Sequence, residues 1–334
     1  MKKTLLALTI AAASTSAFAN VGLENAKPTF EFDPMHKEQF SVSGSVGVGG
    51  YYDTFTNAMY DDWATALTLA VSYQNNRLVG YFETDFEFNW TTDDKDNGFD
   101  VKNEFNTDVD KAWLGYETGA GVLSFGWEND TALDKVDGAG DNTYEFGSSA
   151  GDASDAWNVV KFQGATSGIA YGISYFETDE DHDTADKGVN GYLGYESEVV
   201  NVYGGYETRD EADYQVYSLS GNSTIGELTL GVNFWINEGD KKDLVGKNTS
   251  NLETTGYYLS GAYPVTEQLT LAAGYNANST TEDGQADKDT STVNVAAMYT
   301  LSEKVDMGID ILQELDADTR DEETYVFAAA FYYF

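Results

Sequence analysis

The stretch Glu227–Trp235 reads ELTLGVNFW and alternates between polar and apolar residues from Glu227 to Phe234. Its apolar positions all fall on one face of an extended chain: Leu228, Leu230, Val232 and Phe234. The stretches 169–175 (IAYGISY), 269–275 (LTLAAGY) and 305–311 (VDMGIDI) repeat this pattern. A period of two residues predicts β-strands that each have one apolar and one polar face.

About 16 runs of this kind follow one another along the chain. Their expected bounds are 40–55, 62–74, 77–92, 108–117, 121–129, 156–164, 168–178, 188–196, 199–209, 214–223, 226–237, 252–263, 268–279, 289–301, 304–314 and 322–334. The connections alternate in length: QNNR (74–77) and TGAG (118–121) are short, whereas 91–108 and 279–289 are long and acidic. Short turns at one end and long loops at the other are typical of bacterial transmembrane β-barrels.

The fold prediction is therefore all-β, a 16-stranded antiparallel transmembrane β-barrel. A strand of about 10 residues that is tilted by about 45° crosses a bilayer, and closure is required because lipid satisfies no backbone hydrogen bonds at an open edge. A soluble β-sandwich or β-helix is the alternative. The Gly, Asp, Asn and Thr of the polar faces favour a wetted lumen over a packed core.

Residues 1–19 have the pattern of a secretory signal peptide. Lys2 and Lys3 give a basic start, an apolar stretch follows, and Ala17-Phe18-Ala19 is a small-x-small cleavage site. The mature chain is expected to begin near Asn20, with 20–38 as an N-terminal extension and 39–334 as the barrel. No stretch of about 18 apolar residues follows, so no transmembrane helix is expected.

The charge of the chain excludes several kinds of function. The chain has 57 acidic and 18 basic residues, and loss of Lys2 and Lys3 would leave 16 basic residues and a net charge of −41. Nucleic-acid binding needs basic patches and is therefore disfavoured. The absence of Cys excludes disulfides and thiolate metal sites, and no cofactor is expected.

The chain ends in YVFAAAFYYF (325–334), in which Tyr332 and Phe334 lie on one face of the predicted last strand. A terminal Phe with an aromatic residue two positions earlier resembles the C-terminal assembly signature of Gram-negative outer-membrane barrels. Aromatic residues near other strand ends are candidates for interfacial girdles: Tyr51, Tyr52, Trp63, Trp90, Trp113 and Trp127.

Three further stretches carry a resemblance to the general porins of Gram-negative bacteria, of the enterobacterial or Vibrio type. GSVGVGGYYD (44–53) resembles their first strand, 110–130 their fourth and fifth strands, and NVVKF (158–162) the start of the sixth. The resemblance implies an outer-membrane homotrimer, in contact with lipopolysaccharide and lipid, through which small hydrophilic solutes and ions diffuse. It also implies that the third external loop folds into the barrel.

That loop corresponds to DGAGDNTYEFGSSAGDASDAW (137–157). General porins often carry Pro-Glu-Phe-Gly-Gly-Asp there, and YEFGSS matches it at Glu145, Phe146 and Gly147. Tyr144 replaces the Pro and Ser149 stands in place of the Asp. Asp141 aligns with an upstream carboxylate of the family. The resemblance thus implies that Asp141, Glu145, Phe146 and Gly147 form one side of a pore constriction.

The opposite wall departs from the family, which usually has an Arg and Lys cluster there. The corresponding positions are Ser45, Ala66, Asp110 and Asp155, none of which is basic. A one-residue slip in register would move Lys111 into the wall, and Lys161 lies near in sequence; the three Arg of the mature chain are Arg77, Arg209 and Arg320. Carboxylates without opposing cations attract cations and repel anions. We therefore expect a cation-preferring channel lined by Asp141, Glu145, Asp110 and Asp155.

Other functions stay open at this stage. A substrate-specific channel for cationic nutrients or oligosaccharides would be supported by a track of luminal aromatic residues, and an adhesin or phage receptor by a closed lumen. A hydrolase would need His182 in DEDHD (179–183), which has no visible supporting constellation, so no enzyme is expected. The external acidic loops are expected at most to bind divalent cations loosely.

Overall fold

The computed structural model describes residues 39–61, 63–92, 104–127, 130–149, 156, 158–177, 187–210, 214–242, 249–316 and 322–334. The predicted signal peptide and N-terminal extension lie outside these residues, as do Asp155, His182 and Arg320. Among the described residues, no helix is long and apolar enough to span a membrane.

The described residues form 17 labelled strands and the short helix α3 (Asp134–Asp137). The strands are β1 (Gln39–Asp53), β2 (Ala58–Asp61), β3 (Ala66–Asn75), β4 (Leu78–Thr91), β5 (Glu104–Glu117), β6 (Val122–Trp127), β7 (Val159–Thr166), β8 (Ile169–Glu177), β9 (Lys187–Glu196), β10 (Val200–Arg209), β11 (Gln215–Ile225), β12 (Leu228–Lys242), β13 (Thr249–Pro264), β14 (Leu269–Glu282), β15 (Lys288–Ser302), β16 (Val305–Asp316) and β17 (Thr324–Tyr333).

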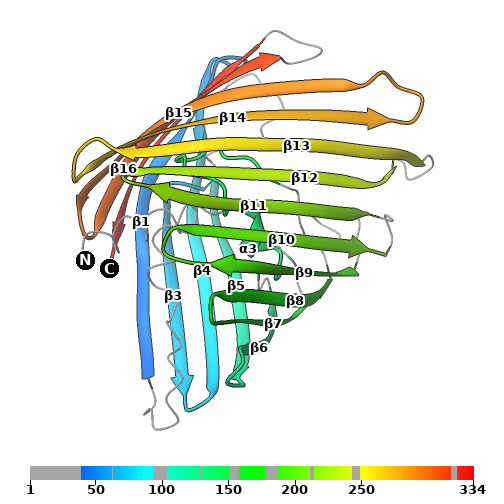
Figure 1. Cartoon of the computed structure of the whole chain (residues 1–334). Coiled ribbons are helices and arrows are strands. Elements are labelled where there is room, and N and C mark those ends of the chain that lie inside the picture. Colours follow the sequence, from blue (N-terminus) through cyan, green and yellow to red (C-terminus); the bar gives the residue numbers. More distant parts are fainter. Residues whose placement is uncertain are drawn as a thin grey trace.

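Apart from β2 and β3, strands that are neighbours in the chain pair antiparallel, and β1 pairs with β17 to close the sheet. β2 and β3 share one place in the wall, because both lie between β1 and β4. Seventeen labelled strands therefore make 16 wall strands, and the predicted 16-stranded antiparallel barrel is confirmed. Figure 1 shows the sheet curving around α3, which contacts β10 and β11.

The two faces of the wall differ as the period-two pattern predicts. Apolar side chains such as Leu230, Val232 and Leu259 point outward and are well exposed, which suits a lipid-facing surface. Polar side chains at the intervening positions point inward, among them Ser174, Asn190 and Asn233, and all three are buried. What covers them is the chain segment that follows β6.

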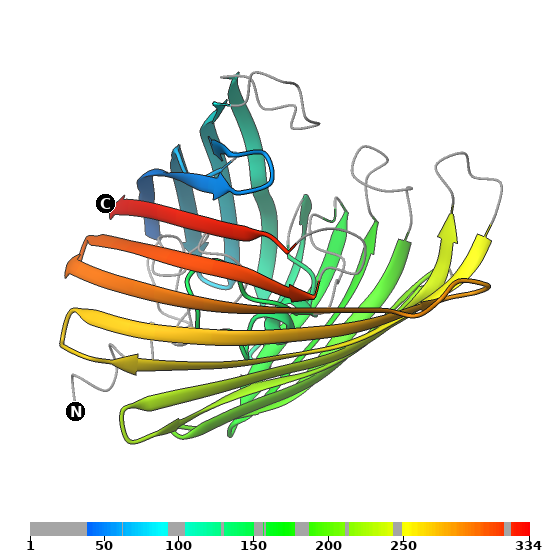
Figure 2. The same cartoon turned by 90° about the horizontal axis from the view of Figure 1, so that it is seen from above.

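The connections fall at two ends of the barrel. Figure 2 shows the β13–β14 and β15–β16 turns at one end and the β14–β15 turn at the other. The predicted short connections 74–77 and 118–121 both join adjacent paired strands. The C-terminal strand presents Tyr332 outward, exposed, and Phe327 and Phe331 inward, buried.

The second wall strand is interrupted between Asp61 and Ala66, whereas the predicted run began at residue 62 and did not include β2. The Asp61 carboxylate accepts hydrogen bonds from the backbone N–H groups of Ala64 (2.8 Å) and Thr65 (2.6 Å). This local capping competes with strand pairing and turns the chain into the lumen. The girdle assignment of Tyr51, Trp63 and Trp113 is therefore wrong: the first two lie in an internal aromatic cluster, and Trp113 packs against the inward-facing Tyr81.

Candidate functional site

The segment 130–149, here called the inner loop, lies inside the barrel against the wall. Its apolar side chains pack against inward-facing residues of β8 to β13, and the members of this cluster are Ala132, Leu133, Val136, Ala139, Ala170, Tyr192, Tyr203, Val216, Trp235 and Tyr258. Burial of these side chains stabilises the folded-in position, since apolar surface leaves water. The loop implied by the family resemblance does fold inward.

Short polar side chains on successive strands hold the backbone of the inner loop. Ser174 of β8 accepts from the Ala132 N–H (3.0 Å). Further along, Asn222 of β11 donates to the Ala139 carbonyl (2.8 Å) and Ser260 of β13 to the Gly140 carbonyl (2.6 Å). Asn233 of β12 accepts from the Gly140 N–H (2.9 Å) and donates to the Ser148 carbonyl (2.9 Å). The Ser and Asn of the polar strand faces thus replace the water that an exposed loop would bind.

One carboxylate anchors the tip of the inner loop. Asp310 Oδ2, on β16, accepts hydrogen bonds from three consecutive backbone N–H groups: Tyr144 (3.1 Å), Glu145 (2.9 Å) and Phe146 (3.1 Å). Asp310 is fully buried. Hydrogen bonds to an ionised acceptor are the strong ones, so Asp310 fixes the Tyr-Glu-Phe segment against the wall.

The side chains of this segment lie among aromatic rings. The Tyr144 hydroxyl donates to the Ala329 carbonyl of β17 (3.2 Å), and Glu145 accepts a hydrogen bond from the Tyr51 hydroxyl. The Phe146 ring lies 6.3 Å from that of Tyr51. Glu145 and Phe146 are both half-buried, and the Glu145 Oε2 atom is buried.

Asp141 and Gly147 lie against each other in the loop. A Cβ at position 147 would collide with the Asp141 carboxylate, so any larger residue there would displace that carboxylate. Asp141 Oδ1 accepts from the Thr143 N–H (2.8 Å) and hydroxyl (2.9 Å). Burial raises the pKa of Asp141 to about 6, and nearby Asp310 adds to the effect.

Asp137, at the end of α3, has a similar environment. Burial raises the pKa of this carboxyl to about 7, assisted by the charges of Asp134, Asp141 and Glu207. Because a raised carboxyl pKa favours the neutral form, Asp137 and Asp141 both lose their charge well above the usual range for Asp.

Two lysines hold the start of the inner loop. The ammonium of Lys111 lies 2.9 Å from the Asp130 carboxylate, and Lys161 donates to the Asp130 carbonyl. Both side chains face inward, which settles the register question for Lys111. They bind the loop backbone and carboxylate, and do not form the free basic cluster that the family usually has.

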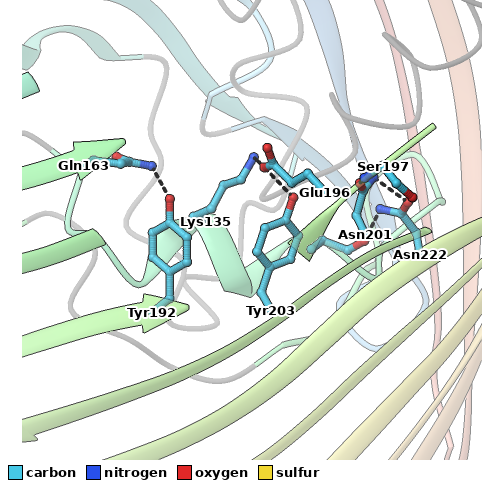
Figure 3. A network of polar contacts seen from close by, with 9 residues as sticks. Lys135, Gln163, Tyr192, Glu196, Ser197, Asn201, Tyr203 and Asn222 are labelled. Carbon is cyan, nitrogen blue, oxygen red and sulfur yellow. Dashed lines mark hydrogen bonds and ion pairs between the residues drawn. The ribbon is translucent and has the colours of Figure 1, made fainter. Parts of the chain in front are cut away.

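Lys135 is the third luminal cation, and Figure 3 shows its surroundings. Its ammonium lies 3.2 Å from Glu196 and 5.2 Å from the Tyr203 ring centroid. The Tyr203 hydroxyl donates to Glu196 (2.8 Å) and Gln163 donates to the Tyr192 hydroxyl (2.9 Å). This network ties α3 to the wall, so Lys135 is also paired.

The wall formed by β3, β4 and β5 is acidic. Asp85 is hydrogen-bonded to Thr68 and lies against Asp110, and Glu83 accepts from the Tyr81 hydroxyl. The β4–β5 register shifts by one residue between Glu83 and Asp85. This β-bulge lets Asp110 reach the luminal Asp85 although the adjacent Lys111 also faces inward.

The predicted wall positions are only partly brought together. Ser45 is buried and inward, Ala66 begins β3 on the luminal face that Thr68 shares, and Asp110 joins Asp85. Asp155 lies outside the described residues. Arg209, close to an external connection, is bound to Glu207 at 2.7 Å and lies over the Tyr214 ring.

Sequence reasoning missed Glu83, Asp85, Asp310 and Trp63. The acids of YFETDFEF (81–88) stand at every second position, so the same period-two pattern marks Glu83 and Asp85 as luminal. Asp310 is luminal by its place in VDMGIDI, but no sequence pattern indicates that three N–H groups more than 160 residues away would reach it. Within the described parts of the chain, no group of three or more His, Cys, Asp and Glu residues is arranged to hold a metal ion.

Comparison with known proteins adds a family and several solved barrels. The family model described as Gram-negative porin matches residues 4–319, and no curated protein matches. The chain is 16% identical to the trimer form of in-vitro folded OmpT from Vibrio cholerae, covering 90% of this chain and 100% of that one at a TM-score of 0.67. An anion-selective porin from Comamonas acidovorans is 15% identical, with coverage of 89% and 100% and a TM-score of 0.63. OmpF of Salmonella typhi, in complex with daunomycin, is 14% identical, with coverage of 88% and 97% and a TM-score of 0.62.

Proposed function

On the premise that this chain belongs to the family of Gram-negative porins, and is therefore an outer-membrane channel for passive diffusion, we propose that its pore prefers cations. The fold alone does not set the preference, since one barrel of similar fold is an anion-selective porin. The preference must come from the charges that line the lumen.

The observation that carries the proposal is the pairing of luminal charges. Each of the luminal cations described above is bound to an acidic residue or to the loop backbone: Lys111, Lys135, Lys161 and Arg209. Carboxylates lie both on the inner loop, at Asp137, Asp141 and Glu145, and on the wall at Glu83, Asp85 and Asp110. A lumen with surplus negative charge concentrates cations and repels anions.

Homotrimer assembly, signal-peptide cleavage near Ala19 and contact with lipopolysaccharide form the rest of the proposal. A trimer is supported by the trimer form of the V. cholerae protein of similar fold. In this proposal Phe334 and Tyr332 form the assembly signature, and the exposed Tyr332 faces lipid. Small hydrophilic solutes and cations are the expected permeants.

The double change Asp141→Asn and Glu145→Gln tests the proposal. We expect the cation-to-anion permeability ratio to fall, by roughly fivefold at most for each charge removed, because a unit charge contributes about 1 kcal/mol at contact distances in water. The measurement is the reversal potential across a planar bilayer under a salt gradient. The matched control is Asp283→Asn in the exposed β14–β15 turn. An unchanged ratio in the double variant would refute the assigned roles of Asp141 and Glu145.

The pH dependence of selectivity gives a second prediction. Asp137 and Asp141 have pKa values raised to about 7 and about 6, so both are charged near pH 8 and largely neutral near pH 5. Cation preference is expected to fall as the pH drops through this window. The change should be smaller in the variant Asp137→Asn/Asp141→Asn, and an equal change in both proteins would contradict the assignment.

A further inference from the structure

Six aromatic side chains on β1, β17 and the broken second wall strand form a continuous series of ring contacts, here called the aromatic ladder: Tyr60, Tyr51, Phe327, Trp63, Phe331 and Tyr333. Successive ring centroids lie 5.0, 4.7, 5.4, 6.0 and 6.5 Å apart. Four of these five contacts are stacked, with interplanar angles of 12° to 17°. The ladder follows β17 from the tip of the inner loop toward the C-terminus.

Trp63 is placed in the ladder by the interruption of its strand. Asp61 accepts hydrogen bonds from the N–H groups of Ala64 and Thr65, and the Thr65 hydroxyl donates to the Gly49 carbonyl (3.2 Å). A Cβ at Gly47 or Gly49 would collide with Ala64, so these two glycines make room for the turn inside the barrel. Strand pairing in the wall is interrupted at this point. The indole of Trp63 stacks on the rings of Phe327 and Phe331.

The ladder has both apolar faces and polar edges. Phe327 and Phe331 are buried, whereas Tyr60, Trp63 and Tyr333 are half-buried and keep accessible surface. Trp63 Nε1 donates to the Tyr51 hydroxyl (2.6 Å), which donates to Glu145. At the other end, the Tyr333 hydroxyl and Asp306 Oδ1 are buried and have no hydrogen-bond partner in the described structure. Buried polar atoms without partners mark a place where a ligand or water completes the bonding.

We propose that the aromatic ladder is a binding track for saccharides, in which pyranose rings stack on Trp63 and its neighbours. This inference rests on the proposed function of an open diffusion channel and names a class of solute for it. Porins pass hydrophilic solutes, and a pyranose is a hydrophilic solute with a flat apolar C–H face that suits an aromatic ring. Its hydroxyl groups match the Tyr333 hydroxyl and Asp306 Oδ1 at the C-terminal end of the track.

The test is block of the ion current by a neutral β-1,4-linked glucose hexamer in planar bilayers. The native protein is expected to show concentration-dependent closures. In Trp63→Ala the binding constant obtained from these closures is expected to fall by about tenfold, since truncation of an aromatic anchor typically costs more than 1 kcal/mol. Trp127→Ala, at an exposed outward-facing position, is the matched control and should bind as the native protein does.

Tyr333→Phe keeps the ring and removes only the hydroxyl, so it tests the track with little effect on packing, and a severalfold weaker block is expected. A native channel that conducts ions but is not blocked by the hexamer would overturn the saccharide track and leave the porin function intact. Equal block in Trp63→Ala would also overturn it. Block by benzyltrimethylammonium but not by the hexamer would assign the ladder to aromatic cations instead. A folded protein without ion conductance would contradict the proposed function itself.

Discussion

Replacing Asp310 by Ala is expected to release the tip of the inner loop and to raise the single-channel conductance, with a noisier open state. The substitution removes the acceptor of three backbone N–H groups. A buried donor left without a partner costs about 1–3 kcal/mol, so the loss is expected to reach about 3 kcal/mol or more in total. That is comparable with the free energy that keeps a packed loop in place.

Single-channel recording, together with limited proteolysis of the segment 130–149, measures this release. Asp283→Asn is the matched control, because Asp283 is an exposed carboxylate in the β14–β15 turn, away from the inner loop. Asp310→Asn keeps an oxygen acceptor without the charge and is expected to be intermediate. If Asp310→Ala had native conductance and native resistance to protease, the anchoring role would be wrong.

Replacing Lys111 by Met is expected to destabilise the barrel by about 3–5 kcal/mol, the usual cost of removing one partner of a buried ion pair. Lys111 is almost fully buried and bound to Asp130, with Glu83 and Asp110 also close. Without the Lys111 ammonium, the carboxylates of Asp130, Glu83 and Asp110 would remain close to one another with little solvent around them. The start of the inner loop would also lose the contact of its Asp130 side chain.

Urea unfolding of the protein in detergent micelles measures this effect through the midpoint of the transition. Lys187→Met is the matched control: Lys187 lies 4.0 Å from Asp210 and both side chains are well exposed, so the pair contributes about 0–1 kcal/mol. A Lys111→Met barrel as stable as this control would show that the carboxylates are neutral or well solvated without the ammonium.

The sequence by itself determined the architecture. A side-chain period of two, repeated in ELTLGVNFW, VDMGIDI and similar runs, assigns each residue to lipid or lumen, because consecutive side chains of a strand alternate between faces. The alternation of short and long connections then distinguishes the two ends of the barrel. The inward loop at Glu145, Phe146 and Gly147 came from a family motif and not from periodicity.

Only the tertiary structure decided which luminal groups meet. The β-bulge in β5 brings both Asp110 and Lys111 to luminal partners, which strict alternation forbids, and the Asp61 turn sends Trp63 into the lumen. Asp310 gains its role from a loop more than 160 residues away. Local sequence fixes strand and face because those depend on neighbouring residues, whereas contacts across the lumen depend on barrel closure, register and bulges, which together bring distant residues within hydrogen-bonding distance.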